Sequence, residues 1–306
     1  MAEGKVKKLR ILNWKIQTQI AGWAFVSLPI LGFLLFQAVP LFFSLFVSFT
    51  QYDFFTGEFT WVGFENYVRA FHDRYFLFSL ENTALALLGL GVQVVVALLL
   101  AMLLTANVKG QPIFRAFFFV PTLCSSVAVT LVWKWMFNVD FGILNSILGA
   151  FGIPPIGWLT DPNISMVSMI IQGVWMGAGS GMVMYVAALS NAPKELYEAA
   201  EIDGANAIQK FFHITIPTIS PTTFFILATS LIGTMTDFAR YRLMTDGGPS
   251  SSTLTTALYI YQTAFTSTYE YDYSYATAMS WLLGVAIIIL VAMLFLSSKK
   301  WVHYKD

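Results

Sequence analysis

The chain of 306 residues is 57% hydrophobic and 11% charged, and its 17 basic and 17 acidic side chains give a formal net charge of zero. Soluble domains carry about 25% charged residues, so this composition excludes an ordinary soluble protein and favours a single membrane domain. The balanced charge gives no indication of a nucleic-acid partner. The single cysteine, Cys124, excludes a disulfide within the chain, and we expect it to be a small buried side chain.

Six apolar runs are predicted to cross the bilayer, because a hydrocarbon core requires about 20 apolar residues per helix. The first run follows a basic N-terminus and is too long for a cleaved signal peptide. The predicted fold class is therefore an all-α integral membrane protein. We expect a cytoplasmic N-terminal segment at 1–22, a transmembrane domain at 23–297 and a cytoplasmic tail at 298–306. The six runs are Trp23–Phe49, Thr83–Ala106, Ile113–Phe137, Ile164–Leu189, Pro217–Phe238 and Tyr275–Leu296.

Charge distribution orients these spans, because Lys and Arg near helix ends tend to remain in the cytoplasm. With the N-terminus inside, 12 basic residues lie on the cytoplasmic side and 4 lie outside, so both termini are predicted to be cytoplasmic. Lys134, near the outer end of the third span, is expected to snorkel to the interface. The outer segment Asn138–Asn163 contains several prolines and glycines, which predict an irregular loop.

The connection between the fourth and fifth spans is more structured than a loop requires. Pro193 suits the first turn of a helix, with Asn191 as a possible cap, and Gly204 suits the left-handed residue that ends it. A second short helix is predicted from Ala205 to His213, and it must stop before a proline. The result is a cytoplasmic helix-turn-helix. The alternative is an amphipathic element lying on the bilayer surface.

The residues of this connection resemble the EAA loop of ABC importer permeases. Glu198-Ala199-Ala200 is followed after three residues by Gly204, and after nine more by Ile214-Thr215-Ile216-Pro217. Ile216 stands where the family usually has Leu. The resemblance implies a type I permease fold in which the coupling loop, residues 190–217, docks on a cytoplasmic ATPase. The implied coupling residues are Glu195, Tyr197, Glu198, Ala199, Ala200, Asp203, Gly204, Ala205, Phe211 and Pro217.

Other motifs are similar to the maltose-type carbohydrate importers, and within them to the first permease of the pair. Ser274 departs from the pattern, because members usually have Gly there. The motifs are GFENYVRAF at 63–71, KGQPIFRAFFFVPTL at 109–123, VWKWMFN at 132–138, GWLTDP at 157–162, TDGGPSSST at 245–253 and YIYQTAF at 259–265.

This resemblance implies a permease subunit of an ATP-driven importer that moves a sugar or oligosaccharide across the bacterial cytoplasmic (inner) membrane. The implied partners are a second homologous permease, a cytoplasmic ATPase dimer, an extracytoplasmic solute-binding protein and membrane lipid, with no nucleic acid. The chain itself is expected to be no enzyme and to bind no cofactor or metal, with ATP and Mg on the partner ATPase.

Polar groups within the third to fifth spans are candidates for the solute pathway, because lipid-facing polar atoms cost free energy. Small hydroxyls are also common packing residues, so each one has this alternative. The family resemblance narrows these candidates to positions near the sugar contacts of the maltose-type permeases. Trp175 would add an aromatic face against a sugar ring. Asp237 either lines the cavity or lies at the hydrated boundary of its span. The predicted pathway set is Thr122, Ser126, Trp175, Gly177, Ser180, Ser230, Gly233, Thr234 and Asp237.

Three glycines of the fourth span, Gly173, Gly177 and Gly181, recur at every fourth position. They predict close helix packing or a locally unwound lining. Arg240 and Arg242, just beyond the fifth span, favour either an acidic solute or contact with a partner, and we expect the partner.

Two other functions compete with this interpretation. An ion-coupled secondary transporter commonly has paired repeats, broken helices in both halves and buried ionisable groups, and the sequence has no matched pair of this kind. A membrane enzyme is disfavoured, because His72, His213 and His303 lie in separate polar segments and no nucleophile is paired with a base.

Overall fold

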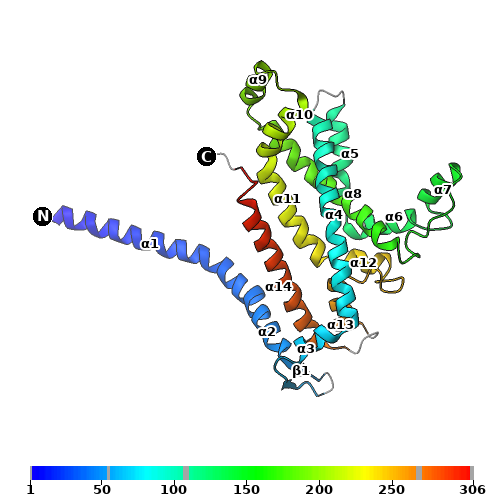
Figure 1. The fold of residues 1–306 in the computed structure, drawn as a ribbon. Helices are drawn as coiled ribbons and strands as arrows, with labels where there is room; N and C mark the ends of the chain where they lie inside the picture. The colour runs from blue at the N-terminus through cyan, green and yellow to red at the C-terminus, as the bar shows by residue number, and fades with distance from the viewer. Residues whose placement is uncertain (1, 54–55, 106–109, 267–270, 304–306) are drawn as a thin grey trace.

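A computed structural model of the chain describes residues 2–53, 56–105, 110–266 and 271–303, with the side chains of residues 2–13 and 15 excepted (Figure 1). Within these ranges, one short antiparallel ribbon pairs β1 (Thr50–Tyr52) with β2 (Phe59–Trp61), and every other element is helical. The predicted all-α membrane fold is therefore confirmed, with a minor β-hairpin added. The predicted end of the second span at Ala106 and the last three residues of the expected tail lie outside the described residues.

In the described part of the chain, five helical stretches are long and apolar enough to cross a membrane. The first and fourth stretches each contain a π-helical turn, η1 and η2. The stretches comprise residues 16–33 of α1 (Ala2–Phe33) with η1 (Leu34–Ala38) and α2 (Val39–Ser48); α4 (Arg74–Thr105); α8 (Ser165–Ser190); α10 (Ala207–Lys210), η2 (Phe211–Thr215) and α11 (Ile216–Thr236); and α14 (Tyr273–Ser298). The remaining helices are α3 (Glu65–His72), α5 (Gln111–Leu123), α6 (Ser126–Met136), α7 (Ile143–Ala150), α9 (Lys194–Ile202), α12 (Ala239–Met244) and α13 (Thr256–Phe265).

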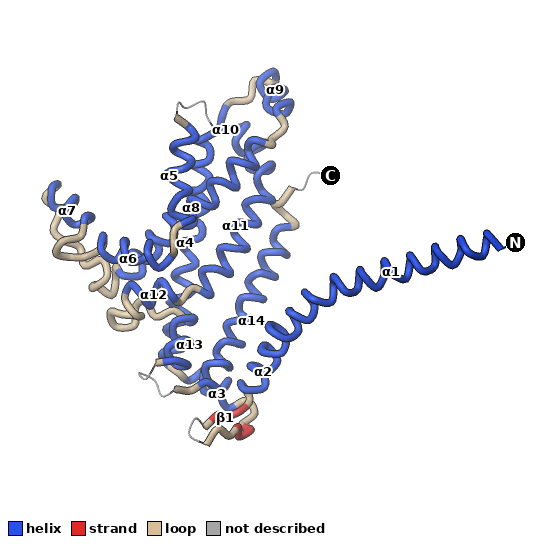
Figure 2. The backbone as a smooth tube through the Cα atoms, turned by 180° about the vertical axis from the view of Figure 1, so that it is seen from behind, coloured by secondary structure: helices blue, strands red, loops and turns tan. Residues whose placement is uncertain are grey.

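Four of these helices, α4, α8, α11 and α14, form the body of the molecule (Figures 1 and 2). α4 and α8 share the most extensive contact, where buried Ala97 and Ala101 of α4 meet buried Met182 and Tyr185 of α8. By contrast, α1 diverges from this body in both views and exposes apolar side chains such as Phe25. Small residues on α4 thus allow the close helix approach that membrane helices use in place of a hydrophobic driving force.

The third predicted span is broken into two helices. α5 and α6 meet at an angle of 103°, so Ile113–Phe137 is not the continuous span that the apolar run predicts. Pro121 lies in the last turn of α5, and Cys124 after it has an extended backbone with φ −78° and ψ 154°. Proline lacks the N–H that would continue the helix and crowds the preceding turn. Cys124 is exposed at this break, so its expected burial is wrong.

The segment Asn138–Asn163, for which the sequence predicts an irregular outer loop, is more ordered than that prediction, because it contains α7 and a buried asparagine. Asn145 donates its amide to two backbone carbonyls, and its Oδ1 accepts from Ile156 N at 3.1 Å and from Trp158 Nε1 at 2.9 Å. These four bonds satisfy the hydrogen-bonding capacity of the side chain. They tie the stretch after α7 back onto the start of the segment.

Candidate functional site

A cavity of about 360 Å³ lies among α4, α6, α8, α11 and α12. Its volume falls within the range of small-molecule sites. The structure brings seven of the nine predicted pathway residues to its lining: Ser126, Gly177, Ser180, Ser230, Gly233, Thr234 and Asp237.

Two predicted pathway residues are not part of this lining. Thr122 donates its hydroxyl to the backbone oxygen of Phe119 at 2.7 Å, which is a local helix contact. Trp175 packs edge-to-face on Trp133, with ring centroids 5.5 Å apart, and 42% of its surface is exposed. The aromatic face expected from Trp175 therefore lies away from the cavity.

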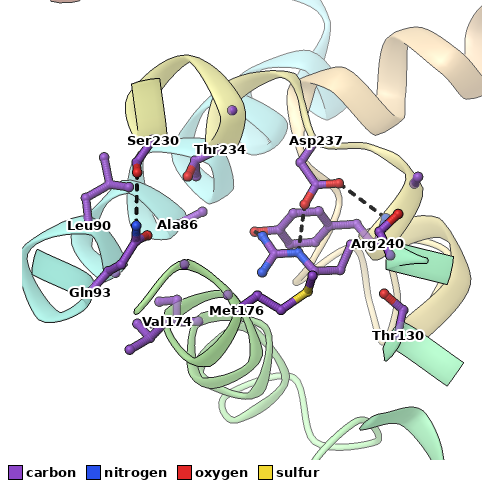
Figure 3. Close-up of a pocket in the computed structure, with 18 of the residues that line it drawn as sticks. Ala86, Leu90, Gln93, Thr130, Val174, Met176, Ser230, Thr234, Asp237 and Arg240 are labelled. Carbon is purple, nitrogen blue, oxygen red and sulfur yellow. Dashed lines mark hydrogen bonds and ion pairs between the residues drawn. The ribbon is translucent and has the colours of Figure 1, made fainter. Parts of the chain in front are cut away.

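Sequence reasoning missed Gln93, which lines the cavity from α4. Its Nε2 donates to the hydroxyl of Ser230 on α11 at 2.9 Å, a bond visible in Figure 3. The sequence does contain a signal for this residue, because Gln93 is the one carboxamide in the apolar run Thr83–Ala106. A carboxamide in a membrane helix is costly unless it is paired or faces a cavity.

Arg240 also lines the cavity, where we expected it to contact a partner outside. Its Nε donates to Oδ2 of Asp237 at 2.7 Å, and its Nη1 donates to the backbone oxygen of Met169 at 3.0 Å. α12 packs against α6, and from there the Arg240 side chain reaches the backbone of α8 at the cavity wall. Burial raises the pKa of the neighbouring Tyr241 phenol, which therefore stays neutral. Arg242 donates through Nη1 to the hydroxyl of Tyr261.

The glycine series of α8 serves close packing. α8 is helical from Ser165 to Ser190, so the alternative of a locally unwound lining is wrong. A Cβ on Gly181 would lie 2.9 Å from Cβ of Ala97, and one on Gly177 would overlap with the amide of Gln93. One on Gly173 would overlap with the guanidinium of Arg240. The glycines thus allow α4 to pack closely against α8. They also leave room for the side chains of Gln93 and Arg240 beside the α8 backbone.

On one side the cavity is bounded by α6 and α12, which Lys134 joins. Its Nζ donates to the backbone oxygen of Leu243 at 2.8 Å, near the C-terminus of α12. Lys134 therefore binds a helix-end carbonyl where snorkelling was expected, a favourable place for a cation. The bend between α5 and α6 turns α6 away from the direction of α5, and Lys134 of α6 contacts α12 there.

The coupling loop contains α9, which ends as its sequence predicts. Gly204 has φ +75°, the left-handed conformation that glycine adopts without a Cβ clash. Ala205 N donates to Ala200 O at 2.9 Å, and Gly204 N donates to Glu201 O at 3.0 Å. This pair of bonds is the Schellman motif that satisfies the last carbonyls of a helix.

The second half of the coupling loop differs from the prediction. Residues Ala207–Thr236 form one continuous helix, so the expected stop before Pro217 is wrong. The π-turn η2 shifts the hydrogen-bond ladder just before Pro217, and this accommodates a residue without an N–H. Asn191 ends α8 and does not cap α9; a capping box formed by Asn206 and Gln209 begins α10.

The coupling loop lies at the end of the bundle opposite α13 and β1 (Figure 1). It exposes several apolar side chains. Leu196, Ile202, Ile208 and Phe212 are each at least half exposed. Such an exposed apolar patch is typical of a protein-binding surface. Beside it, a hollow of about 320 Å³ is lined by Ala200, Asp203, Gly204, Ala205, Gln209, Lys210, His213 and Ile214.

The other predicted coupling residues divide between the surface and the interior of this loop. Glu195 and Glu198 are exposed on α9, whereas the Tyr197 hydroxyl lies 3.1 Å from Thr215 Oγ1 and ties α9 to η2. Ala199 is exposed on α9, Phe211 packs on its neighbour Phe212 with ring centroids 5.0 Å apart, and Pro217 lies in the first turn of α11. Lys210 hydrogen-bonds Glu201 at 2.7 Å and lowers the pKa of that carboxyl.

Residues 93–303 match the family described as binding-protein-dependent transport system inner membrane component. The chain is 37% identical to the "Probable ABC transporter permease protein YesP" of Bacillus subtilis (strain 168), over 98% of this chain and 96% of that protein. It is also 37% identical to the "Lactose transport system permease protein LacF" of Rhizobium radiobacter, over 80% of this chain and 84% of that protein.

Among solved structures, the chain resembles one in the crystal structure of a bacterial ABC transporter involved in the import of the acidic polysaccharide alginate. The TM-score is 0.81 at 24% identity, and the match covers 94% of this chain and 98% of the other. This likeness concerns the fold. With the family match and the full-length relatives, it leads to one conclusion: the chain belongs to the binding-protein-dependent transport system inner membrane components, the permease subunits of ABC importers.

Proposed function

We propose that the chain is the first permease of a pair that moves a sugar or oligosaccharide into the cytoplasm, through the cavity between α4, α8 and α11. The observation that carries this proposal is the convergence of polar side chains on one cavity within apolar helices. Hydroxyl, amide and carboxylate groups together match the many donors and acceptors of a saccharide. Curated relatives with sugar names, among them lactose and arabinooligosaccharide permeases, support the same class of solute.

The coupling loop is proposed to bind the ATPase. Its exposed apolar side chains and rigid Schellman turn lie on α9 and α10, and α11 continues directly from α10 to the cavity wall. An unbroken helix transmits a displacement at one end to the other. Differential binding of the loop by the two nucleotide states of the ATPase would then bias the cavity between its two orientations.

The proposed assembly contains a second homologous permease, an ATPase dimer that binds ATP and Mg, and an extracytoplasmic binding protein that delivers the solute. A related crystal structure is described as a complex of the alginate transporter with its alginate pentasaccharide-bound periplasmic protein. We place both termini and the coupling loop in the cytoplasm of a bacterium, as the excess of basic residues there predicts.

The test is reconstitution of the chain in liposomes with its partner permease, ATPase and binding protein. Uptake of labelled lactose, raffinose and arabinotriose is measured with and without ATP. We expect ATP-dependent uptake of at least one saccharide, and its loss in Ser230→Trp and Thr234→Trp, which would fill the cavity. Leu88→Trp, on the exposed face of α4, is the matched control. Unchanged uptake in both cavity variants would contradict the proposed pathway.

A further inference from the structure

The start of α11 has a weakened hydrogen-bond ladder. Pro217 and Pro221 lie four residues apart in this helix, and neither has the N–H that would bond to the carbonyl one turn earlier. Directly before them, the π-turn η2 ends with Ile216 N donating to Phe211 O, five residues back. Prolines and π-turns are the usual sites of helix bending. The helix can therefore bend here, between the coupling loop and the cavity, whose lining on α11 begins at Ser230.

Ser220 supplies one of the missing bonds and connects this stretch to the C-terminal tail. Its hydroxyl donates at 2.7 Å to Pro217 O, the carbonyl that the amide of residue 221 would bond in a regular helix. The same oxygen accepts from the backbone N–H of His303 at 2.9 Å. Ser220 is only 3% exposed, so its hydroxyl would be costly to bury without partners. The tail thus bonds directly to the residue that completes the ladder at the prolines.

The tail that brings His303 to α11 is ordered by a tight turn after α14. Ser298 is buried, and its carbonyl accepts from Trp301 N at 3.1 Å. The indole of Trp301 lies near the ring of Phe224 on α11, with centroids 6.3 Å apart. Figures 1 and 2 both show this end of α14 beside α11, at the end of the bundle that carries α10. The tail therefore contacts α11 through a hydrogen bond and an aromatic ring.

Two further hydrogen bonds hold the same stretch from other helices. The hydroxyl of Tyr185 on α8 donates to Thr223 Oγ1 at 2.9 Å. The hydroxyl of Tyr197 on α9 lies 3.1 Å from Thr215 Oγ1. The weak part of the ladder is thus supported from α8, from α9 and from the tail. Of these contacts, the bond from His303 lies nearest to the carbonyl that Pro221 leaves without its usual donor.

From this arrangement we infer that Ser220 is a positioning residue for transport. It binds the tail and stiffens the start of α11, so that movement of the coupling loop reaches the cavity and is not absorbed by bending at Pro217 and Pro221. The inference rests on the proposed function of the coupling loop and adds the C-terminal tail to the path of coupling. Without the contact, the ATPase would still bind the loop and hydrolyse ATP, but less of the movement would reach the cavity lining.

The test compares two substitutions at one residue. His303→Pro removes the backbone N–H that Ser220 accepts, whereas His303→Ala, the matched control, removes the side chain and keeps the N–H. The complete transporter is reconstituted in liposomes, and ATP hydrolysis is measured together with uptake of a labelled saccharide that the wild type imports. We expect His303→Pro to lower the number of solute molecules imported per ATP by about threefold or more, with ATP turnover maintained. His303→Ala should equal the wild type.

Ser220→Ala should lower the same ratio. Because Ser220→Ala and His303→Pro break one shared bond, the double variant should be no worse than the more impaired single variant. Thr229→Val is the control on α11, because the Thr229 hydroxyl donates to carbonyls of its own helix, and it should leave the ratio unchanged. A merely structural role for the contact would lower assembly, ATP turnover and uptake in proportion.

Hydrogen exchange gives a second measurement, which requires no solute. In the assembled complex, peptides covering residues 211–224 should exchange about fivefold faster in His303→Pro than in His303→Ala, because the stretch opens more often without the tail bond. Exchange in α8 should be equal in the two variants. Both substitutions lie after the last helix, so the membrane domain is expected to assemble in each.

Two outcomes would overturn the inference. An unchanged number of solute molecules per ATP in both His303→Pro and Ser220→Ala would show that the contact has no part in coupling, whatever the total rates. Equal exchange over residues 211–224 in His303→Pro and His303→Ala would show that the tail does not stiffen α11. Absence of ATP-dependent saccharide uptake in the wild type would instead remove the proposed function, and this failure is detected before any variant is compared.

Discussion

The carboxamide of Gln93 occupies the space that a side chain at residue 177 would need. A Cβ built on Gly177 would lie 2.5 Å from both Nε2 and Oε1 of Gln93. Gly177 on α8 therefore permits Gln93 on α4 to reach Ser230 on α11, so that three helices meet through one polar side chain. The glycine series, which predicts helix packing, therefore also positions the Gln93 amide in the cavity lining.

This relationship predicts that Gly177→Ala impairs transport although alanine favours helix by about 1 kcal/mol. The new methyl group should displace the Gln93 amide and break its bond with Ser230, which reduces uptake in liposomes at least several-fold. Gly91→Ala is the matched control, because a Cβ at residue 91 of α4 would meet no atom within 4 Å. Equal uptake by the two variants would show that the position of Gln93 has no role in the pathway.

The coupling loop predicts a separation of ATP hydrolysis from transport. Gly204→Asp would place a side chain at φ +75°, costing about 1 kcal/mol or more in strain, and would add a charge to the docking surface. Glu198→Lys reverses a charge on exposed α9. Both variants should insert in the membrane but lose uptake, through weaker ATPase association or uncoupled ATP turnover. Complex assembly, ATP hydrolysis and uptake are measured together.

Gly204→Asn is the control for this experiment, because asparagine tolerates the left-handed conformation and adds no charge. It should retain most of the uptake. Wild-type ATP turnover and uptake in both Gly204→Asp and Glu198→Lys would contradict the coupling role. The loop would then be interpreted as an amphipathic element that lies on the bilayer surface.

The outer segment depends on Asn145. Asn145→Leu would remove four hydrogen bonds and leave partly buried groups such as Ile156 N without a partner. With a net contribution of about 1 kcal/mol for each bond, the segment should loosen by roughly 2–4 kcal/mol. Hydrogen exchange over residues 138–163 should increase, while α4 and α8 remain protected. In the control Asn163→Leu only a local contact with Asp161 is lost. Unchanged exchange in Asn145→Leu would contradict this assignment.

The orientation of the chain is tested by labelling single cysteines in intact cells with an impermeant thiol reagent. The background is Cys124→Ser, because Cys124 is exposed at the break between α5 and α6. Asn163→Cys, before α8, should be labelled, and Lys300→Cys, after α14, should be labelled only once the cells are opened. Labelling in the opposite order would reverse the predicted topology.

Much of the fold follows from local features of the sequence. The spans at 164–189 and 275–296 agree closely with α8 and α14, because the length of an apolar run must match the bilayer wherever the helix packs. Gly204 ends α9 as predicted, because the left-handed conformation depends on one residue and its neighbours. Ser230 and Thr234 of α11 reach one cavity because their spacing of four residues places them on the same helix face.

Other features were decided only by contacts between distant segments. The break after Pro121 converts one predicted span into α5 and the transverse α6, and a proline alone permits either a kinked helix or a break. The Arg240 side chain can reach the cavity because Gly173 of α8 leaves room for its guanidinium. The Gln93 side chain can reach it because Gly177 of α8 leaves room for its amide. Local patterns specify which helices form, whereas the place of a long polar side chain depends on which neighbouring helix has room for it, because a buried polar group must find its partners in the packed interior.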